Sequence, residues 1–198
     1  MLKTCSMLKD DLSSYRAPEM KIKRMADKNE IIRLTKNLYE TDPDTPGYVN
    51  AGAVCSPSCL SFDYALSYYG LIPEAVYTCT SASSGLRKRK TYKNKMGVFT
   101  CQDIPVQAFP FEIRLQKAGN RTFAMASPEK ALCDKLCLLK PVRSKRELKY
   151  MLFEDLRIDQ EEFMNLDFPV LKELCPLYKS TTLNTFGKVI GDLRAESS

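Results

Sequence analysis

Histidine and tryptophan are both absent from this sequence of 198 residues. Without histidine, the protein lacks the commonest general base, the commonest metal ligand and every Ser-His or Cys-His nucleophile pair. We therefore expect a protein that is not an enzyme and that has no catalytic residue, metal or cofactor. The alternative is an enzyme that acts on nucleotides through carboxylates such as Asp103, Glu129 or Asp134. None of these belongs to a carboxylate cluster beside a glycine-rich phosphate loop.

Long apolar segments are missing as well. No run in the sequence reaches the roughly 18–20 apolar residues that a membrane-spanning helix needs. Residues 1–11 lack the uninterrupted apolar core of a signal peptide. We expect a cytoplasmic protein that makes no contact with a membrane.

The eight cysteines include no CxxC pair, which argues against a zinc ribbon and against a thioredoxin-like redox motif. Two CxxxC pairs occur, Cys55 with Cys59 and Cys133 with Cys137. Leucines at helical spacing surround the second pair, so packing in the protein core accounts for it without a metal. In the cytoplasm we expect reduced thiols.

The net charge of +6 is concentrated in the middle of the chain. Residues 1–45 carry 9 basic and 8 acidic side chains, residues 46–139 carry 11 and 6, and residues 140–198 carry 10 of each. The three segments therefore have net charges of +1, +5 and 0. This distribution predicts a local basic surface rather than a general polycation.

The first 45 residues have the element order of a winged helix-turn-helix. The pattern predicts a short helix over residues 7–15 and a second helix over residues 19–29, with Pro18 in the first turn of the latter. On the second helix the apolar residues share one face, and three cations at steps of three and four share another: Lys21, Arg24 and Lys28. Such a helix can dock on its own domain while it offers cations to DNA.

A two-stranded ribbon follows this helix. Ile32 and Leu34 alternate with polar residues as in a half-buried strand, and Lys36-Asn37 suits a tight turn because Asn tolerates the left-handed conformation. The ribbon can lay Arg33 and Lys36 along an adjacent phosphate backbone. The alternative interpretation is a small helical hairpin with a solvated basic face.

A linker over residues 41–47, rich in proline and acidic residues, places a domain boundary after residue 45. In the second domain, residues 86–104 predict a β-hairpin with its turn near residues 94–97. The first arm carries six cations in nine residues: Arg87, Lys88, Arg89, Lys90, Lys93 and Lys95. This arm predicts a surface for nucleic acid or for an acidic partner. The alternative is a solvated edge strand whose lysines prevent edge-to-edge aggregation.

The rest of the second domain mixes helices and strands, so we predict an α+β fold. Ser127-Pro128-Glu129 opens a strong helix, on whose flank we expect Lys130 and Asp134 to pair. A position of Asp134 near the core is the alternative. The other expected elements are a helix over 61–69, a strand over 75–81, a hairpin over 111–126, and helices over 145–156 and 159–174. The structure of residues 179–194 is left open.

Three segments carry a family resemblance. Residues 31–39 read IIRLTKNLY, residues 62–73 read FDYALSYYGLIP, and residues 127–134 read SPEKALCD. In the same order, these segments resemble the IIRLxRGLY wing, the ALSYYGLIP helix and the TPEKALLD segment of AbiEi-type antitoxins, which belong to type IV toxin–antitoxin systems. Asn37 stands where the family's wing usually has glycine.

The resemblance implies a winged helix in residues 1–45 that represses the protein's own operon. It implies an α/β antitoxin domain in residues 46–198, with β-hairpins and C-terminal helices, that neutralises a nucleotidyltransferase-type toxin. Operator DNA and this toxin are then the expected partners. The candidate DNA contacts are Lys21, Lys23, Arg24 and Lys28 on the recognition helix and Arg33 and Lys36 on the wing.

Two questions stay open at this point. The chain begins almost at the second helix of the motif, so the usual first helix is short or absent. The alternative function is therefore a nucleic-acid or protein interaction module of the same fold that does not bind an operator. A homodimer would suit a repressor that reads paired half-sites, but the sequence shows no dimer seam.

Overall fold

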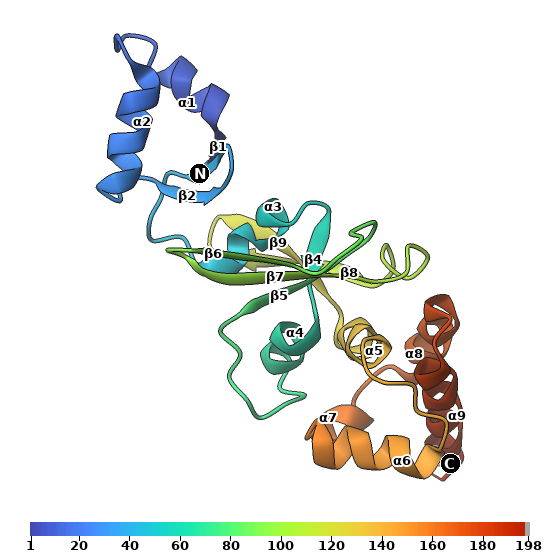
Figure 1. Ribbon diagram of the computed structural model, residues 1–198. Helices are drawn as coiled ribbons and strands as arrows, with labels where there is room; N and C mark the ends of the chain where they lie inside the picture. Colours follow the sequence, from blue (N-terminus) through green and yellow to red (C-terminus); the bar gives the residue numbers. More distant parts are fainter. Residues whose placement is uncertain (197–198) are drawn as a thin grey trace.

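The computed structural model describes residues 1–196 and shows an α+β fold with two β-sheets (Figure 1). The smaller sheet belongs to residues 1–45, which we call the N-terminal unit. Its strands are antiparallel in the order β1-β3-β2, with bounds β1 (Leu2–Thr4), β2 (Ile32–Thr35) and β3 (Leu38–Glu40). Helices α1 (Cys5–Asp11) and α2 (Pro18–Asp27) connect β1 to β2.

Local chemistry explains where these elements begin and turn. The Thr4 hydroxyl accepts a hydrogen bond from the Met7 backbone N–H at 3.2 Å and caps α1, so this helix begins two residues before the predicted start and ends at Asp11. Pro18 occupies the first turn of α2, as predicted. Asn37 adopts a φ of 66° in the β2–β3 turn, which confirms the tight turn predicted there.

Residues 46–196 form what we call the main unit, which is built on a mixed six-stranded sheet. Its order is β6-β7-β5-β4-β9-β8, in which β4–β9 and β5–β7 are parallel and the other neighbours antiparallel. The strands are β4 (Ser58–Leu60), β5 (Cys79–Ser83), β6 (Lys90–Asn94), β7 (Gly97–Asp103), β8 (Ile113–Ala118) and β9 (Arg121–Ala126). The two predicted hairpins, β6–β7 and β8–β9, are confirmed and form the two edges of the sheet.

Helices cover both faces of this sheet (Figure 1). The short helices η1 (Gly47–Asn50) and α3 (Ala51–Val54) lie on the face toward the N-terminal unit, and α4 (Phe62–Tyr68) and α5 (Pro128–Cys137) lie on the opposite face. Among the remaining helices, α8 and α9 pack against α5, and α6 packs against α9. The bounds of these helices are α6 (Lys145–Tyr150), η2 (Met151–Asp155), α7 (Gln160–Met164), α8 (Phe168–Leu174), η3 (Cys175–Tyr178) and α9 (Thr181–Glu196).

Two separate apolar clusters stabilise the protein. The cluster of the N-terminal unit is small and consists of four buried residues: Leu8, Ile22, Ile31 and Tyr39. The main cluster extends from the sheet through α4 and α5 to the C-terminal helices, with Phe62, Phe99 and Phe186 each at most 1% exposed. Because the first cluster is so small, the N-terminal unit gains little stability from burial of its own apolar surface.

Several predicted boundaries were wrong. The strand expected over residues 75–81 is β5, which begins only at Cys79. The helix expected over 159–174 is divided into α7 and α8, because the Asp167 carboxylate caps a new helix at the Val170 N–H and Pro169 fits only the first turn of that helix. Residues 179–194, left open above, lie mostly in α9.

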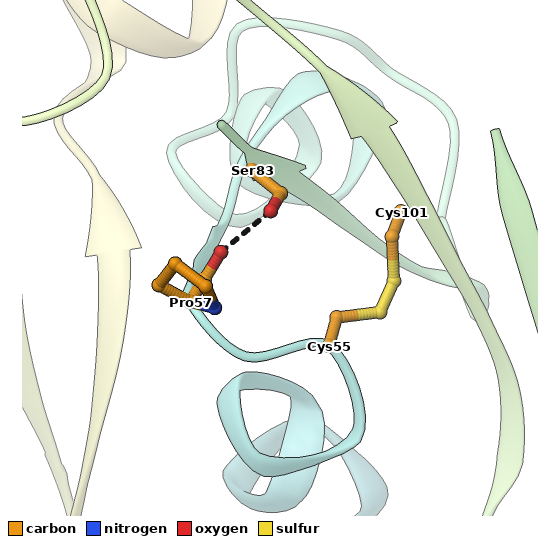
Figure 2. The surroundings of a disulfide bond; sticks show 4 residues. All are labelled: Cys55, Pro57, Ser83 and Cys101. Atoms are coloured by element: carbon orange, nitrogen blue, oxygen red, sulfur yellow. Dashed lines mark hydrogen bonds between the residues drawn. A yellow bond between two sulfur atoms is a disulfide. The ribbon is translucent and has the colours of Figure 1, made fainter. Parts of the chain in front are cut away.

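Cys55 and Cys101 form a disulfide bond, so the expectation of reduced thiols was wrong for this pair. Figure 2 shows the bond, which joins the segment after α3 to strand β7. Both cysteines are buried, and the nearby Ser83 hydroxyl donates a hydrogen bond to the Pro57 carbonyl at 2.6 Å. The pairing links residues 46 positions apart, which the CxxxC spacing of Cys55 with Cys59 did not indicate.

Lys130 and Asp134 form the predicted ion pair, but the pair lies in the core and not on a helix flank. Both side chains are 0% exposed, and the Lys130 Nζ lies 3.3 Å from the Asp134 Oδ1. The hydroxyls of Ser61 and Tyr178 each donate to the Asp134 carboxylate at 2.6 Å, and Lys130 also donates to the Ala108 carbonyl at 3.0 Å. Every charge of the pair is therefore compensated by a partner, as burial requires.

Within residues 1–196, no helix combines the length and the apolar character that crossing a membrane requires.

Candidate nucleic-acid interface

The two faces of α2 differ in the way the sequence predicted. Ile22 is 3% exposed and packs against the small cluster of the N-terminal unit, with Met25 and Ala26 partly buried beside it. Arg24 and Lys28 lie on the opposite side and are exposed. Figure 1 shows α2 at the outer side of the N-terminal unit, with its C-terminal end toward the tip of the β6–β7 hairpin. The helix can therefore meet a large partner without loss of its own packing.

A groove of about 480 Å³ runs along one side of α2. Four cations line it: Arg16, Lys21, Arg24 and Lys28. Glu30 is the acidic residue that lines the groove. The Lys21 Nζ lies 5.6 Å from the centre of the Tyr15 ring. This cation–π contact holds Lys21 at the groove. The groove thus presents a dense positive charge that suits a polyanion.

Lys23 lies on the other side of α2, away from this groove. It lines a separate groove of about 760 Å³ together with Lys9, Arg33 and Lys95. Glu19 and Asp27 also line that groove, and Glu19 pairs with Lys9 at 2.5 Å. The four cations proposed for the recognition helix are therefore divided between two surfaces. Lys36, in the turn between β2 and β3, is exposed and lines neither groove.

The tip of the β6–β7 hairpin contacts the N-terminal unit. The Asn94 side chain donates a hydrogen bond to the Leu34 carbonyl at 3.2 Å, and the Lys95 ammonium donates to the Asn29 side chain. Within the main unit the same tip lies close to η1, where a Cβ on Gly47 would lie 2.4 Å from the Met96 carbonyl oxygen. The contact brings Lys95 beside Lys23 and Arg33, which is a juxtaposition that the sequence did not indicate.

The other cations of the basic arm lie further from α2. Arg87, Lys88 and Arg89 precede strand β6, and Lys90 and Lys93 lie on it; all five are exposed. Strand β6 is an edge of the large sheet. Both earlier interpretations of this arm, a partner surface and a protected sheet edge, are compatible with that position.

A buried carboxylate joins the N-terminal unit to the other edge of the sheet. Glu40, at the end of β3, is 0% exposed, and Arg121 of strand β9 donates to it at 2.7 and 3.2 Å. Burial alone raises the pKa of Glu40, but hydrogen bonds from Arg121, the Met1 amino group and the Asp42 backbone N–H outweigh burial and lower the pKa to about 2. Glu40 is therefore ionised, and it fixes the N-terminal unit against the main unit at a second point.

No protein-family model matches this chain, and no curated protein matches it. Function is therefore inferred from the residues and their geometry.

The carboxylates named for the enzyme alternative lie in three different environments. Asp103 accepts a hydrogen bond from the Leu86 N–H at 3.0 Å, Glu129 accepts one from the Asp167 N–H at 3.0 Å, and Asp134 is enclosed in the core. Each carboxylate has its own partners, so the structure does not bring them together. Among residues 1–196, no group of three or more Cys, Asp or Glu side chains has the arrangement of a metal site.

Sequence reasoning missed three residues of this region: Lys9, Arg16 and Arg121. Lys9 lies in α1, and Arg16 lies in the turn between α1 and α2. The sequence did not show which face of α1 points toward α2, because the bounds of this helix were not known. Arg121 lies in the hairpin expected over residues 111–126. A lone arginine in a hairpin carries no local indication that it neutralises a carboxylate 81 residues away.

Proposed function

We propose that this protein is a DNA-binding transcriptional autorepressor and the antitoxin of an AbiE-like, type IV toxin–antitoxin system that counteracts a nucleotidyltransferase-type toxin. The N-terminal unit serves as its winged helix-turn-helix, with α2 as the recognition helix and β2–β3 as the wing. The observation that carries the proposal is the groove of Lys21, Arg24 and Lys28 on a helix whose opposite face is buried. The three family-like segments of the sequence support the same proposal.

The chemistry of the groove favours the DNA backbone as its ligand. Each lysine or arginine that meets a phosphate releases a condensed counterion, so the logarithm of the binding constant falls by about 0.9 per contact for each decade of salt. A helix of this kind reads base edges while cations on its flank position it on the backbone. Arg24 lies near the centre of the exposed face, and Lys21 and Lys28 lie on its flank.

Fluorescence anisotropy with a labelled fragment of the protein's own promoter tests DNA binding. The test variant carries Lys21→Gln, Arg24→Gln and Lys28→Gln. The matched control carries Lys140→Gln, Arg143→Gln and Lys172→Gln, which remove the same charge from exposed positions of the main unit. We expect the test variant to reduce the salt slope by about 3 and the control to leave it unchanged. Equal reductions of the salt slope in the test variant and the control would contradict a specific role for α2.

Growth rescue tests the antitoxin part of the proposal. The product of the adjacent gene is expressed from an inducible promoter, with and without this protein, and surviving cells are counted. Rescue is expected with the wild-type protein. No rescue from a neighbour that is demonstrably toxic would contradict the antitoxin role.

The alternative function is an interaction module without operator binding. The observation that favours it is the exposed basic arm of the β6–β7 hairpin, which offers a partner surface independent of α2. Charge reversal by Lys21→Glu and Arg24→Glu separates the two functions. A protein that rescues growth unchanged with both substitutions, and whose wild type does not bind its promoter, would be such a module.

A further inference from the structure

A cavity of about 470 Å³ opens on the main unit, on the face of the sheet that carries α4. This volume falls within the range of roughly 300–1,000 Å³ that is typical of small-molecule sites. Residues from α4, α5, β5, β7 and η2 meet there, together with residues from the segment after α4 and the segment before β6. The cavity plays no part in the proposed DNA contact, because none of the cations of α2 or the wing lines it.

The floor of the cavity holds a hydroxyl without a partner. Thr100 is 4% exposed, and its Oγ1 forms no hydrogen bond. Its register neighbour Thr80 is different, since that hydroxyl accepts from the Tyr64 N–H at 3.0 Å and donates to the Ser61 carbonyl at 2.6 Å. A buried hydroxyl that stays unsatisfied is costly and rare. The Thr100 hydroxyl thus keeps a hydrogen-bonding capacity that the Thr80 hydroxyl has already used.

The charged lining residues fall into two classes. Asp63 pairs with Lys135 at 2.6 Å and Glu74 pairs with Arg157 at 2.7 Å, so these two acids are neutralised. Arg89 and Asp155 line the same cavity and form no ion pair with any of residues 1–196. One free guanidinium and one free carboxylate can therefore face a ligand. The guanidinium suits an anion such as phosphate, because it donates two parallel hydrogen bonds.

The remaining wall is mostly apolar. It contains Thr78 and four aliphatic side chains: Leu66, Ile72, Val76 and Leu156. A flat, weakly polar ring can lie against such a wall, with a carboxylate such as Asp155 accepting from an exocyclic amine.

We propose that this cavity binds a nucleoside monophosphate. Arg89 holds the phosphate, Thr100 bonds a ribose hydroxyl, and the base lies against the aliphatic wall with its amine toward Asp155. The site is independent of the proposed operator binding and of the toxin. It gives a use to Arg89, which was grouped with the basic arm on sequence grounds but faces a different surface from Lys95.

Thermal shift and isothermal titration calorimetry with AMP, GMP, CMP and UMP test the proposal. Inorganic phosphate, ribose 5-phosphate and adenosine serve as partial ligands. We expect at least one nucleoside monophosphate to raise the melting temperature and to bind with one equivalent per chain, because a ligand of the native state stabilises it by mass action. The partial ligands should bind at least tenfold more weakly. No binding of any of the four nucleotides would overturn the proposal.

Three variants locate the site. Arg89→Gln should weaken binding tenfold or more, Thr100→Val should weaken it several-fold, and Arg87→Gln should leave it unchanged because Arg87 does not line the cavity. Without ligand, Thr100→Val should keep or raise the melting temperature, since it removes an unsatisfied hydroxyl. A loss with Arg87→Gln equal to that with Arg89→Gln would show general charge attraction and overturn the assignment. Wild-type affinity in both Arg89→Gln and Thr100→Val would do the same.

Discussion

The contact between Glu40 and Arg121 should control both the stability of the protein and its dependence on pH. Glu40 is buried with two Arg121 hydrogen bonds, at 2.7 and 3.2 Å. A pKa lowered from 4.5 to about 2 corresponds to about 3 kcal/mol of stability at neutral pH. The Arg121→Gln substitution removes the strongest of the groups that lower this pKa, while the Asp42 N–H stays in place at 3.0 Å. We expect the free energy of unfolding to fall by about 2–3 kcal/mol at pH 7. This is somewhat less than the cost of a buried charge that has no partner at all.

The pH dependence follows from the direction of the shift. The pKa of Glu40 is lower in the folded protein than in the unfolded chain, so its contribution is complete above pH 4.5 and is lost as the pH falls from about 4.5 to about 2. In Arg121→Gln the folded-state pKa rises again, so less stability remains to be lost. The difference between wild type and variant should therefore shrink as the pH is lowered from 5 to 3.

Urea unfolding followed by circular dichroism, at pH 7, 5, 4 and 3, measures this difference. Arg157→Gln is the matched control, because it breaks an ion pair of the same 2.7 Å length whose partners are 62% and 48% exposed. It should cost less than about 1 kcal/mol. Equal losses in the two variants, or a loss in Arg121→Gln that does not change with pH, would refute the reasoning.

Three further outcomes are expected. Lys130→Met should lower the free energy of unfolding by about 3–5 kcal/mol in urea titrations, because it leaves the Asp134 carboxylate without its cation in the core. The double variant with Asp134→Asn should regain part of this loss. Gly47→Ala should cost about 1–3 kcal/mol by thermal denaturation, since its Cβ would meet the Met96 carbonyl oxygen, whereas Gly52→Ala, with its nearest neighbour at 3.6 Å, should cost less. Thiol titration in denaturant should count six free thiols without reductant and eight with it; eight in both would contradict the disulfide.

Elements that depend on neighbouring residues could be predicted from the sequence. Pro18 begins α2, Asn37 forms the β2–β3 turn, and the Ser127 hydroxyl caps α5 by accepting from the Lys130 N–H at 3.2 Å. In each case the chemistry that fixes the backbone lies within a few residues along the chain. The basic face of α2 could be predicted for the same reason, because helical periodicity alone places its cations.

Features that depend on distant residues could not be predicted. The burial of Asp134 is decided by Ser61 and Tyr178, which are 73 and 44 residues away, and the helix periodicity left the carboxylate at the edge of the apolar stripe. The pairing of Cys55 with Cys101 and the position of Lys95 beside Arg33 likewise follow from how β7 and the hairpin tip are placed in the sheet. The candidate cavity belongs to this second group, since five elements of the main unit meet to form it.

The contacts by which the main unit holds the N-terminal unit have a consequence for synthesis on the ribosome. Leu34 and Glu40 are made before their partners Asn94 and Arg121, which follow about 60 and 80 residues later. At roughly 5–20 residues per second, this delay is several seconds. With four buried residues as its core, the leading segment lacks the means to hold its shape in that interval. We therefore expect a nascent chain to acquire its basic groove only after most of the large sheet has been made, and a prematurely terminated chain to lack this groove.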